Sequence, residues 1–391
     1  MSTSTPAATP AVSYMGVHNS VPVQSRSEFP SSLNVSDFAE VVGREAQWKL
    51  SPAAKLRPLL DGELDGSSYP FDSTPAAGLL IGFVPVSEVA RGVAGIPEER
   101  LTANAWGQTT EVLLIELEGN IVEPLRVVRH GLGAEPRAAH TLIRVKPGAS
   151  ATLVMVSKGV ALLGETVEFD LGEGSTLHTV FVGQWDAGGI QFASHFATIG
   201  KRAKLTHIVV DVGGDVVIVN PNAHLVGERS EAHLLGAYFA DATQHHEHRV
   251  YVNHVGPQTI SRVNYKGALH GRGARTVWVG DVLIGPDAIG TDSYEQNRNL
   301  VLSEGTRADS IPNLEIKTGD IQGAGHASAT GRFDDEQLFY LQSRGIAELE
   351  ARRLVVLGFL LEVLQKIEDP DMSRELTIAM QEKLTHTEEV S

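Results

Sequence analysis

The spacing of turns is the feature that most restricts how this chain can fold. Between about residues 108 and 300, short runs rich in Val, Ile and Leu alternate with turn sequences, and no long helical period appears. Four similar turns follow one another at offsets of 26, 28 and 27 residues, beginning at Lys146 (KPGASA), Gly172 (GEGSTL), Gly200 (GKRAKL) and Gly227 (GERSEA). Such a repeat is typical of a solenoid, whose coils pair their backbones and stack their inward apolar side chains. The sequence therefore predicts a mainly β protein with a β-helix core over residues 108–331, and a two-sheet sandwich is the alternative.

Composition restricts the class of protein. The chain has 391 residues, ordinary apolar content (42%) and a net charge of −16, which argues against a nucleic-acid surface built from clustered Lys and Arg. The N-terminus lacks a basic segment followed by an apolar stretch, and no window approaches the roughly 20 apolar residues of a membrane span. We therefore expect a cytoplasmic protein with neither nucleic-acid nor membrane partners.

The segments before the repeats differ from them in composition. Residues 1–35 are rich in Ser, Thr, Pro and Ala and predict a flexible N-terminal arm. Residues 36–107 predict a mixed α/β cap. In this cap, Ser36 could begin a helix that includes Trp48 and ends at Ser51-Pro52, and we also expect a strand at 79–84 and a helix around 97–103.

After Gly331 the hydrophobic period becomes helical. Residues 332–391 predict a C-terminal helical domain with three helices: DEQLFYLQSR, capped by Asp334 or Asp335, then AELEARRLVVLGFLLEVLQKI and MSRELTIAMQEKL. The second of these carries a wide apolar stripe. The domain therefore either packs against the β-helix or receives a partner.

Histidines are the candidate metal ligands, because the chain contains no cysteine. The absence of cysteine excludes disulfides, thiolate nucleophiles and a cluster held by the chain's own sulfur. His246 and His248 alternate along a predicted strand, so their side chains share a face and could bind a metal together. The alternative is a polar layer of the sheet, in which histidines hydrogen-bond between coils.

A single histidine, His326, stands in the small-residue sequence QGAGHASAT, which predicts a loop with an accessible imidazole. The chain has no GxSxG, HExxH, Walker A or GxGxxG motif. Scattered carboxylates on a β-helix leave a carbohydrate-active enzyme as one hypothesis, and nothing in the residues themselves demonstrates catalysis.

Three stretches carry a family resemblance. YKGAL at 265–269, QNRNLVLSEGTRADSIPNLEI at 296–316 and DDEQLFYLQSRGI at 334–346 closely resemble the SufB/SufD family of iron–sulfur cluster assembly proteins. The resemblance implies a right-handed parallel β-helix flanked by helical N- and C-terminal parts. It also implies a scaffold subunit without enzymatic activity.

The resemblance further implies partners. In this family SufB and SufD pair through their β-helices, and the C-terminal helical part docks the ABC-type ATPase SufC, which binds the ATP. A chain without cysteine is similar to SufD rather than to cysteine-bearing SufB. By the same resemblance, His326 (in HASAT, where the family usually has HGAT) is the expected ligand of an iron ion or transient iron–sulfur cluster shared with SufB.

The tail residues expected to serve the ATPase are apolar or basic: Leu338, Phe339, Leu341, Arg344, Leu354 and Leu357. We expect deletion of residues 332–391 to abolish ATPase binding while the β-helix stays folded. A homodimer is expected to be possible for the isolated chain. Besides the carbohydrate-active enzyme, a homo-oligomeric scaffold that binds metal through its own histidines remains an alternative.

Overall fold

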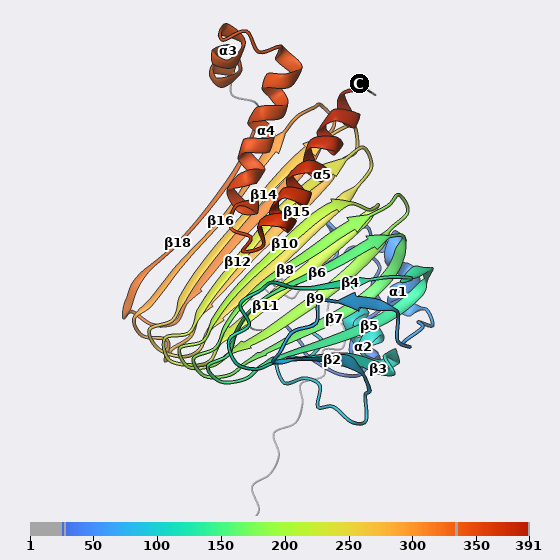
Figure 1. Cartoon of the computed structure of the whole chain (residues 1–391), viewed down its shortest axis with the longest axis vertical. Coiled ribbons are helices and arrows are strands. Elements are labelled where there is room, and N and C mark those ends of the chain that lie inside the picture. The colour runs from blue at the N-terminus through green and yellow to red at the C-terminus, as the bar shows by residue number, and fades with distance from the viewer. Residues whose placement is uncertain (1–25, 27–28, 333–334, 390–391) are drawn as a thin grey trace, which may run out of the picture.

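The computed structural model describes residues 26, 29–332 and 335–389, which form a β-helix with helices at both ends (Figure 1). In this part of the chain the strands form two nine-stranded sheets. Sheet I contains β1 (Phe71–Ser73), β4 (Leu125–Arg129), β6 (Ser150–Gly159), β8 (Thr176–Trp185), β10 (Lys204–Gly213), β12 (Glu231–Asp241), β14 (Ile260–His270), β16 (Thr291–Val301) and β18 (Ile321–Gly331). Sheet II contains β2 (Leu79–Pro85), β3 (Glu111–Leu117), β5 (Gly133–Val145), β7 (Ala161–Leu171), β9 (Ile190–Ile199), β11 (Val216–Leu225), β13 (His245–His254), β15 (Arg275–Ile284) and β17 (Arg307–Ile316).

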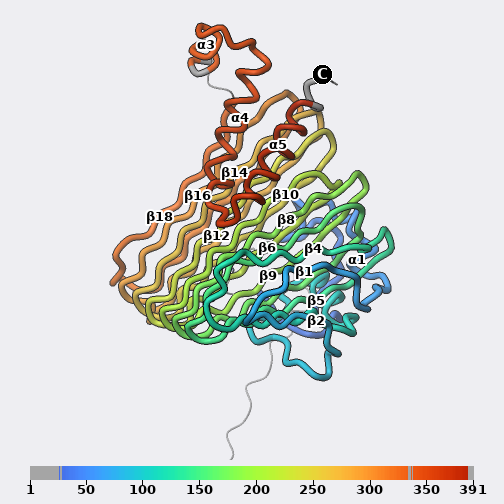
Figure 2. Tube along the Cα trace, in the orientation of Figure 1, coloured from blue at the N-terminus to red at the C-terminus, as the bar shows by residue number. Residues whose placement is uncertain are grey.

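Strand pairing confirms the β-helix and excludes the sandwich. From β3 onward the chain alternates between the two sheets, and each strand pairs in parallel with the strand two steps later. The first two strands differ, because β1 pairs with β4 and β2 pairs with β3 in the antiparallel sense. Figure 2 shows the resulting stack of coils.

The predicted turns lie at equivalent corners of successive coils. The third residue of each turn has a left-handed backbone, with φ of 70° at Gly148, 67° at Gly174, 56° at Arg202 and 57° at Arg229. Glycine adopts this conformation without strain, whereas a residue with a Cβ does not. The two arginines are each held by a side-chain contact to the neighbouring coil, Arg202 to Glu173 and Arg229 to Gln258.

The N-terminal part of the described chain packs on sheet II. Helix α1 (Ala53–Asp61) contacts helix α2 (Arg100–Gln108), and both contact β5 and β7. The strand predicted at 79–84 is confirmed as β2, and the helix expected around 97–103 is α2, which Glu99 caps.

The helix predicted from Ser36 through Trp48 is wrong. The 3-10 turn η2 (Val35–Asp37) and a hydrogen-bonded turn at 45–51 form there instead, and the α-helix begins immediately after Pro52. Proline favours the first turn of a helix, so Ser51-Pro52 starts a helix rather than ending one. The predicted flexible arm lies mostly outside the described residues, but the Arg26 side chain is mostly buried.

The C-terminal helices are α3 (Asp335–Ser343), α4 (Glu348–Leu364) and α5 (Pro370–Glu389). Helices α4 and α5 lie along the outer face of sheet I, and α3 projects beyond it (Figure 1). Leu360 and Met380 from these helices share one apolar cluster with Val180 and Ile208 from the sheet. Arg126 on β4 donates bidentate hydrogen bonds of 2.8 and 2.7 Å to Asp369, which lies in the turn between α4 and α5.

This packing argues against one expectation from the sequence. Removal of residues 332–391 would expose the apolar outer face of sheet I to water, so the truncated β-helix is not expected to stay folded unchanged. No helix of the described residues combines the length and apolar content needed to cross a membrane.

We predict that Leu360→Ala lowers the free energy of unfolding by about 2–5 kcal/mol, because Leu360 is fully buried between α4 and sheet I. Leu349→Ala in the same helix is the matched control, since that side chain is 57% exposed and its loss should change stability by less than about 0.5 kcal/mol. Urea unfolding of both variants measures the difference. Equal losses would contradict the packing of α4 on the sheet.

Candidate functional site

His326 lies on the last strand of sheet I, at the open end of the β-helix. Strand β18 pairs with β16 on one side, and within the described chain no strand pairs with its other edge. The predicted loop at His326 is therefore wrong, because backbone pairing to β16 imposes a strand on a sequence of small residues. The imidazole is 44% exposed and remains accessible, as expected.

Glu295 lies beside His326 in the adjacent coil. The two residues are register partners of β16 and β18, and Glu295 Oε1 lies 3.9 Å from His326 Nδ1. The carboxylate is fully buried, and neither oxygen has a hydrogen-bond partner among the described residues. Burial, together with the nearby charge of Asp281, raises the pKa of Glu295 to about 8.

Sequence reasoning missed Glu295. Residues of β16 alternate between buried and more exposed positions, with Ser293, Glu295, Asn297 and Asn299 buried. The period-2 pattern could have indicated that Glu295 faces the interior. Its contact with His326 depends on the register between two coils, which no local pattern encodes.

The open end of the β-helix is formed by β17 and β18. Strand β17 ends sheet II as β18 ends sheet I, and Ile311 and Ile316 of β17 are both exposed. The free edges carry unpaired backbone groups, which can pair with strands of another chain. His326 therefore lies at a surface suited to association between β-helices.

His246 and His248 share the inner face of β13, as predicted, but no third ligand lies beside them among the residues that the structure describes. His246 Nε2 lies 2.9 Å from the Gly213 carbonyl oxygen, and His248 Nε2 lies 2.8 Å from Asp211 Oδ2. Among the described residues no group of three or more His, Asp or Glu side chains is placed to hold a metal ion. The histidines thus form the polar interior layer that was the alternative interpretation.

The C-terminal residues expected to serve a partner differ in exposure. Leu338 and Leu357 are buried, and Leu357 belongs to the cluster on sheet I. Phe339 is 72% exposed and Leu354 is 42% exposed. Leu341 is half-buried, and the exposed Arg344 lies 5.1 Å from the centroid of the Tyr340 ring.

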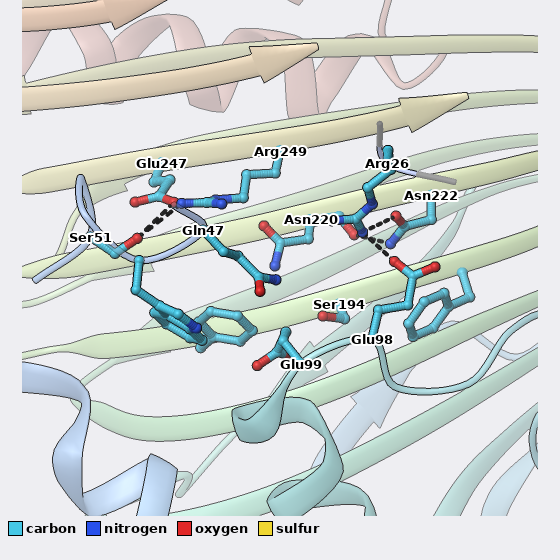
Figure 3. A pocket seen from close by; sticks show the side chains of 13 residues that line it. Arg26, Gln47, Ser51, Glu98, Glu99, Ser194, Asn220, Asn222, Glu247 and Arg249 are labelled. Carbon is cyan, nitrogen blue, oxygen red and sulfur yellow. Dashed lines mark hydrogen bonds and ion pairs between the residues drawn. The ribbon is translucent and has the colours of Figure 1, made fainter. Parts of the chain in front are cut away.

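A separate pocket lies between the N-terminal segment and the outer face of sheet II (Figure 3). Its three carboxylates already hold structural contacts. Glu98 pairs with Arg26, Glu99 accepts hydrogen bonds from the first turn of α2, and Glu247 pairs with Arg249. These contacts join the N-terminal segment to the β-helix, and among the described residues the pocket holds no free pair of acids.

The family follows from comparison with known proteins. The SufBD core domain of the SUF system of iron–sulfur cluster assembly matches residues 130–359. The chain belongs to the SufBD family. An iron-sulfur cluster assembly SufBD family protein of Mycobacterium tuberculosis is 41% identical over 374 residues, covering 93% of this chain and 94% of that protein.

More distant relatives bear on the branch of the family. The iron-sulfur cluster assembly protein SufD of Escherichia coli is 25% identical over 276 residues, which cover 61% of this chain and 64% of that protein. A second SufBD family protein of M. tuberculosis is 27% identical over 204 residues, covering 52% of this chain and 24% of that protein. The chain is therefore SufD-like at distant identity, and the family takes part in iron–sulfur cluster assembly.

The buried histidines predict a loss of stability in acid. His254 is fully buried and hydrogen-bonded to Thr259 and Ser261, and burial lowers its pKa to about 3. The unfolded chain, with an ordinary pKa near 6.5, binds more protons between about pH 6.5 and 3. The stabilisation that comes from keeping His254 buried and neutral is therefore fully present above pH 6.5 and is lost as the pH falls towards 3.

We predict that His254→Gln flattens the dependence of the unfolding free energy on pH between 6.5 and 4, by up to about 1.4 kcal/mol per pH unit. Urea unfolding at several pH values measures this slope. The free energy of unfolding at pH 7.5 serves as the reference. At that pH, residue 254 is mostly uncharged in the folded and the unfolded state of both proteins. An unchanged slope would show that His254 is not protonated preferentially on unfolding.

Proposed function

We propose that this chain is a SufD-like scaffold subunit, without catalytic activity of its own, in a SufBCD-type iron–sulfur cluster assembly complex of the cytoplasm. The observation that carries the proposal is the position of His326. An accessible imidazole lies on the terminal strand of an open β-helix end, in a cysteine-free chain of the SufBD family. A partner that supplies thiolate ligands would complete a site there.

The partner proposed for the open end is a SufB-like paralogue. Its β-helix would continue or face the two sheets at β17 and β18, where the backbone edges are unpaired within the described chain. Two SufBD family proteins of different similarity occur in M. tuberculosis, which supports pairing between paralogues. The same free edges favour a homodimer when the paralogue is absent.

The chemistry of His326 suits a transient ligand. Imidazole is a borderline ligand for iron, and His in place of a thiolate reduces the negative charge around a cluster. Iron or a nascent cluster is the cargo of the scaffold, which must release it. A neutral ligand from this chain opposite a thiolate of the SufB-like partner would bind the cargo without trapping it.

The ATPase partner is proposed to dock on the C-terminal helices. Helix α3 extends beyond sheet I and exposes Phe339 and Tyr340, and Leu354 of α4 is also partly exposed. Large apolar side chains exposed together mark protein interfaces. The ATP would be bound by this SufC-like subunit, because the present chain has no nucleotide motif.

The two alternatives receive less support from the structure. A carbohydrate-active enzyme would require converging free carboxylates, whereas those of the N-terminal pocket are engaged in structural contacts. A scaffold that holds metal by itself through His246 and His248 would require a further ligand beside them, and the described side chains supply none.

Co-expression with SufB-like and SufC-like partners tests the proposed function. We expect a purified complex of one copy of this chain, one SufB-like subunit and two ATPase subunits. We also predict that His326→Ala leaves this complex intact and lowers its iron content about tenfold or more, because one ligand is lost. Native mass determination and iron analysis measure the two results.

Two outcomes would contradict the proposal. A chain that purifies alone in the presence of both partners is not a subunit of such a complex. If the complex that contains His326→Ala binds as much iron as the parent complex, the iron is bound at another site. His130→Ala, a change of an exposed histidine at the opposite end of the β-helix, is the matched control for iron content.

The docking surface makes a separate prediction. Phe339→Ser should weaken binding of the ATPase subunit about tenfold or more, because an exposed aromatic anchor would be lost. Leu80→Ser on β2, also exposed but distant from α3, should change binding less than about twofold. Titration of the ATPase onto each purified variant measures the affinities. Equal affinities for the two variants would exclude Phe339 from the interface.

A further inference from the structure

The Glu295 carboxylate is unusual because it is buried without a partner. Both of its oxygens lack a hydrogen-bond donor among the residues described, and the side chain is fully buried. A buried carboxylate of this kind normally costs stability, so its presence requires another explanation. His326 Nδ1 lies 3.9 Å from Glu295 Oε1.

The interior is shaped to accommodate this carboxylate. Gly280 of β15 faces it from sheet II, and a Cβ at Gly280 would collide with Glu295 Oε2 and with the ring of Trp278. The absence of a side chain at Gly280 thus leaves the space in which the carboxylate lies. The register of β16 and β18 then directs the carboxylate towards His326.

We propose that Glu295 is a positioning residue that accepts a hydrogen bond from the Nδ1–H of His326 and thereby leaves Nε2 as the atom that binds iron. This inference rests on the proposed function of His326. By this inference Glu295, a residue of the preceding coil, determines which nitrogen of the His326 imidazole carries the proton and how the ring is oriented.

The geometry requires only a small adjustment. Closing the gap from 3.9 Å to a normal hydrogen bond takes roughly 1 Å. His326 is part-exposed on a terminal strand, so its side chain can move by this amount without disturbing the packed coils. Binding of a cation at Nε2 would strengthen the Nδ1–H donor. An oxygen of the Glu295 carboxyl group, which is mostly protonated near neutral pH because burial raises its pKa to about 8, would then gain the partner it lacks.

With the gap closed, the arrangement would be the one found for histidines that bind metals in proteins. A carboxylate or carbonyl that accepts from the second ring nitrogen fixes the tautomer and raises the basicity of the ligating nitrogen. Loss of such a residue typically lowers metal affinity about 10–100-fold. Glu295 would therefore act through His326 and not as a ligand itself.

The test uses the complete chain in complex with its SufB-like partner, and Co²⁺ alone as the probe. Titration followed by the visible absorption of bound Co²⁺ gives the affinity. We expect Glu295→Leu to lower this affinity about 10–100-fold. Glu295→Gln should restore most of it, because an amide oxygen still accepts from Nδ1–H. Glu304→Leu, which removes an exposed carboxylate from the turn after β16, is the matched control and should have no effect.

Stability separates positioning from a structural role. Removal of a buried carboxylate without a partner should leave the midpoint of urea unfolding unchanged or raise it, whereas loss of a structural residue would lower it. Gly280→Ala provides a second variant, because the added Cβ would displace the carboxylate while Glu295 is retained. We expect it to weaken Co²⁺ binding as well.

The outcomes distinguish this inference from the proposed function. If His326→Ala binds Co²⁺ as tightly as the parent, the proposed role of His326 fails. If His326→Ala weakens binding but Glu295→Leu does not, only the positioning role of Glu295 is overturned. A fall in affinity for Glu295→Leu that is matched by a lower unfolding midpoint would assign Glu295 a structural role instead.

Discussion

Parallel backbone pairing between successive coils is the constraint on which the rest of this structure depends. Each strand satisfies its N–H and C=O groups with the strands of the coil before and the coil after, so no coil is complete by itself. The first coil is closed by the antiparallel strands β1 and β2. The last coil, β17 and β18, has no such closure within the described chain, and this is why the candidate site lies at a surface ready for pairing.

The outer faces of the two sheets are covered differently. Sheet II is covered by α1, α2 and the N-terminal segment, whose charged groups pair among themselves at Arg26 and Glu98. Sheet I is covered by α4 and α5 through a continuous apolar cluster. The C-terminal helices therefore stabilise the β-helix as well as presenting α3, which follows the strand of His326, β18, along the chain.

The interior of the β-helix is more polar than its apolar repeats suggested. His248 is stacked on Tyr238 and hydrogen-bonded to Asp211, and His195 contacts His207. Most of these groups find partners between the sheets. Among the buried carboxylates of the described residues, Glu295 is the one whose two oxygens both lack a hydrogen-bond partner, and this distinguishes it as a functional candidate.

The sequence by itself favoured the β-helix and determined the helical tail and the shared face of His246 and His248, because turn spacing and side-chain period are local properties of the chain. Parallel pairing between coils then excluded the sandwich. Only the tertiary structure decided that residues 36–48 are not an α-helix, that His326 lies in a strand and that Leu357 is buried. It also decided that Glu295 and His326 are neighbours. These outcomes depend on the register between coils and on which faces are covered, and no local pattern of residues carries that information.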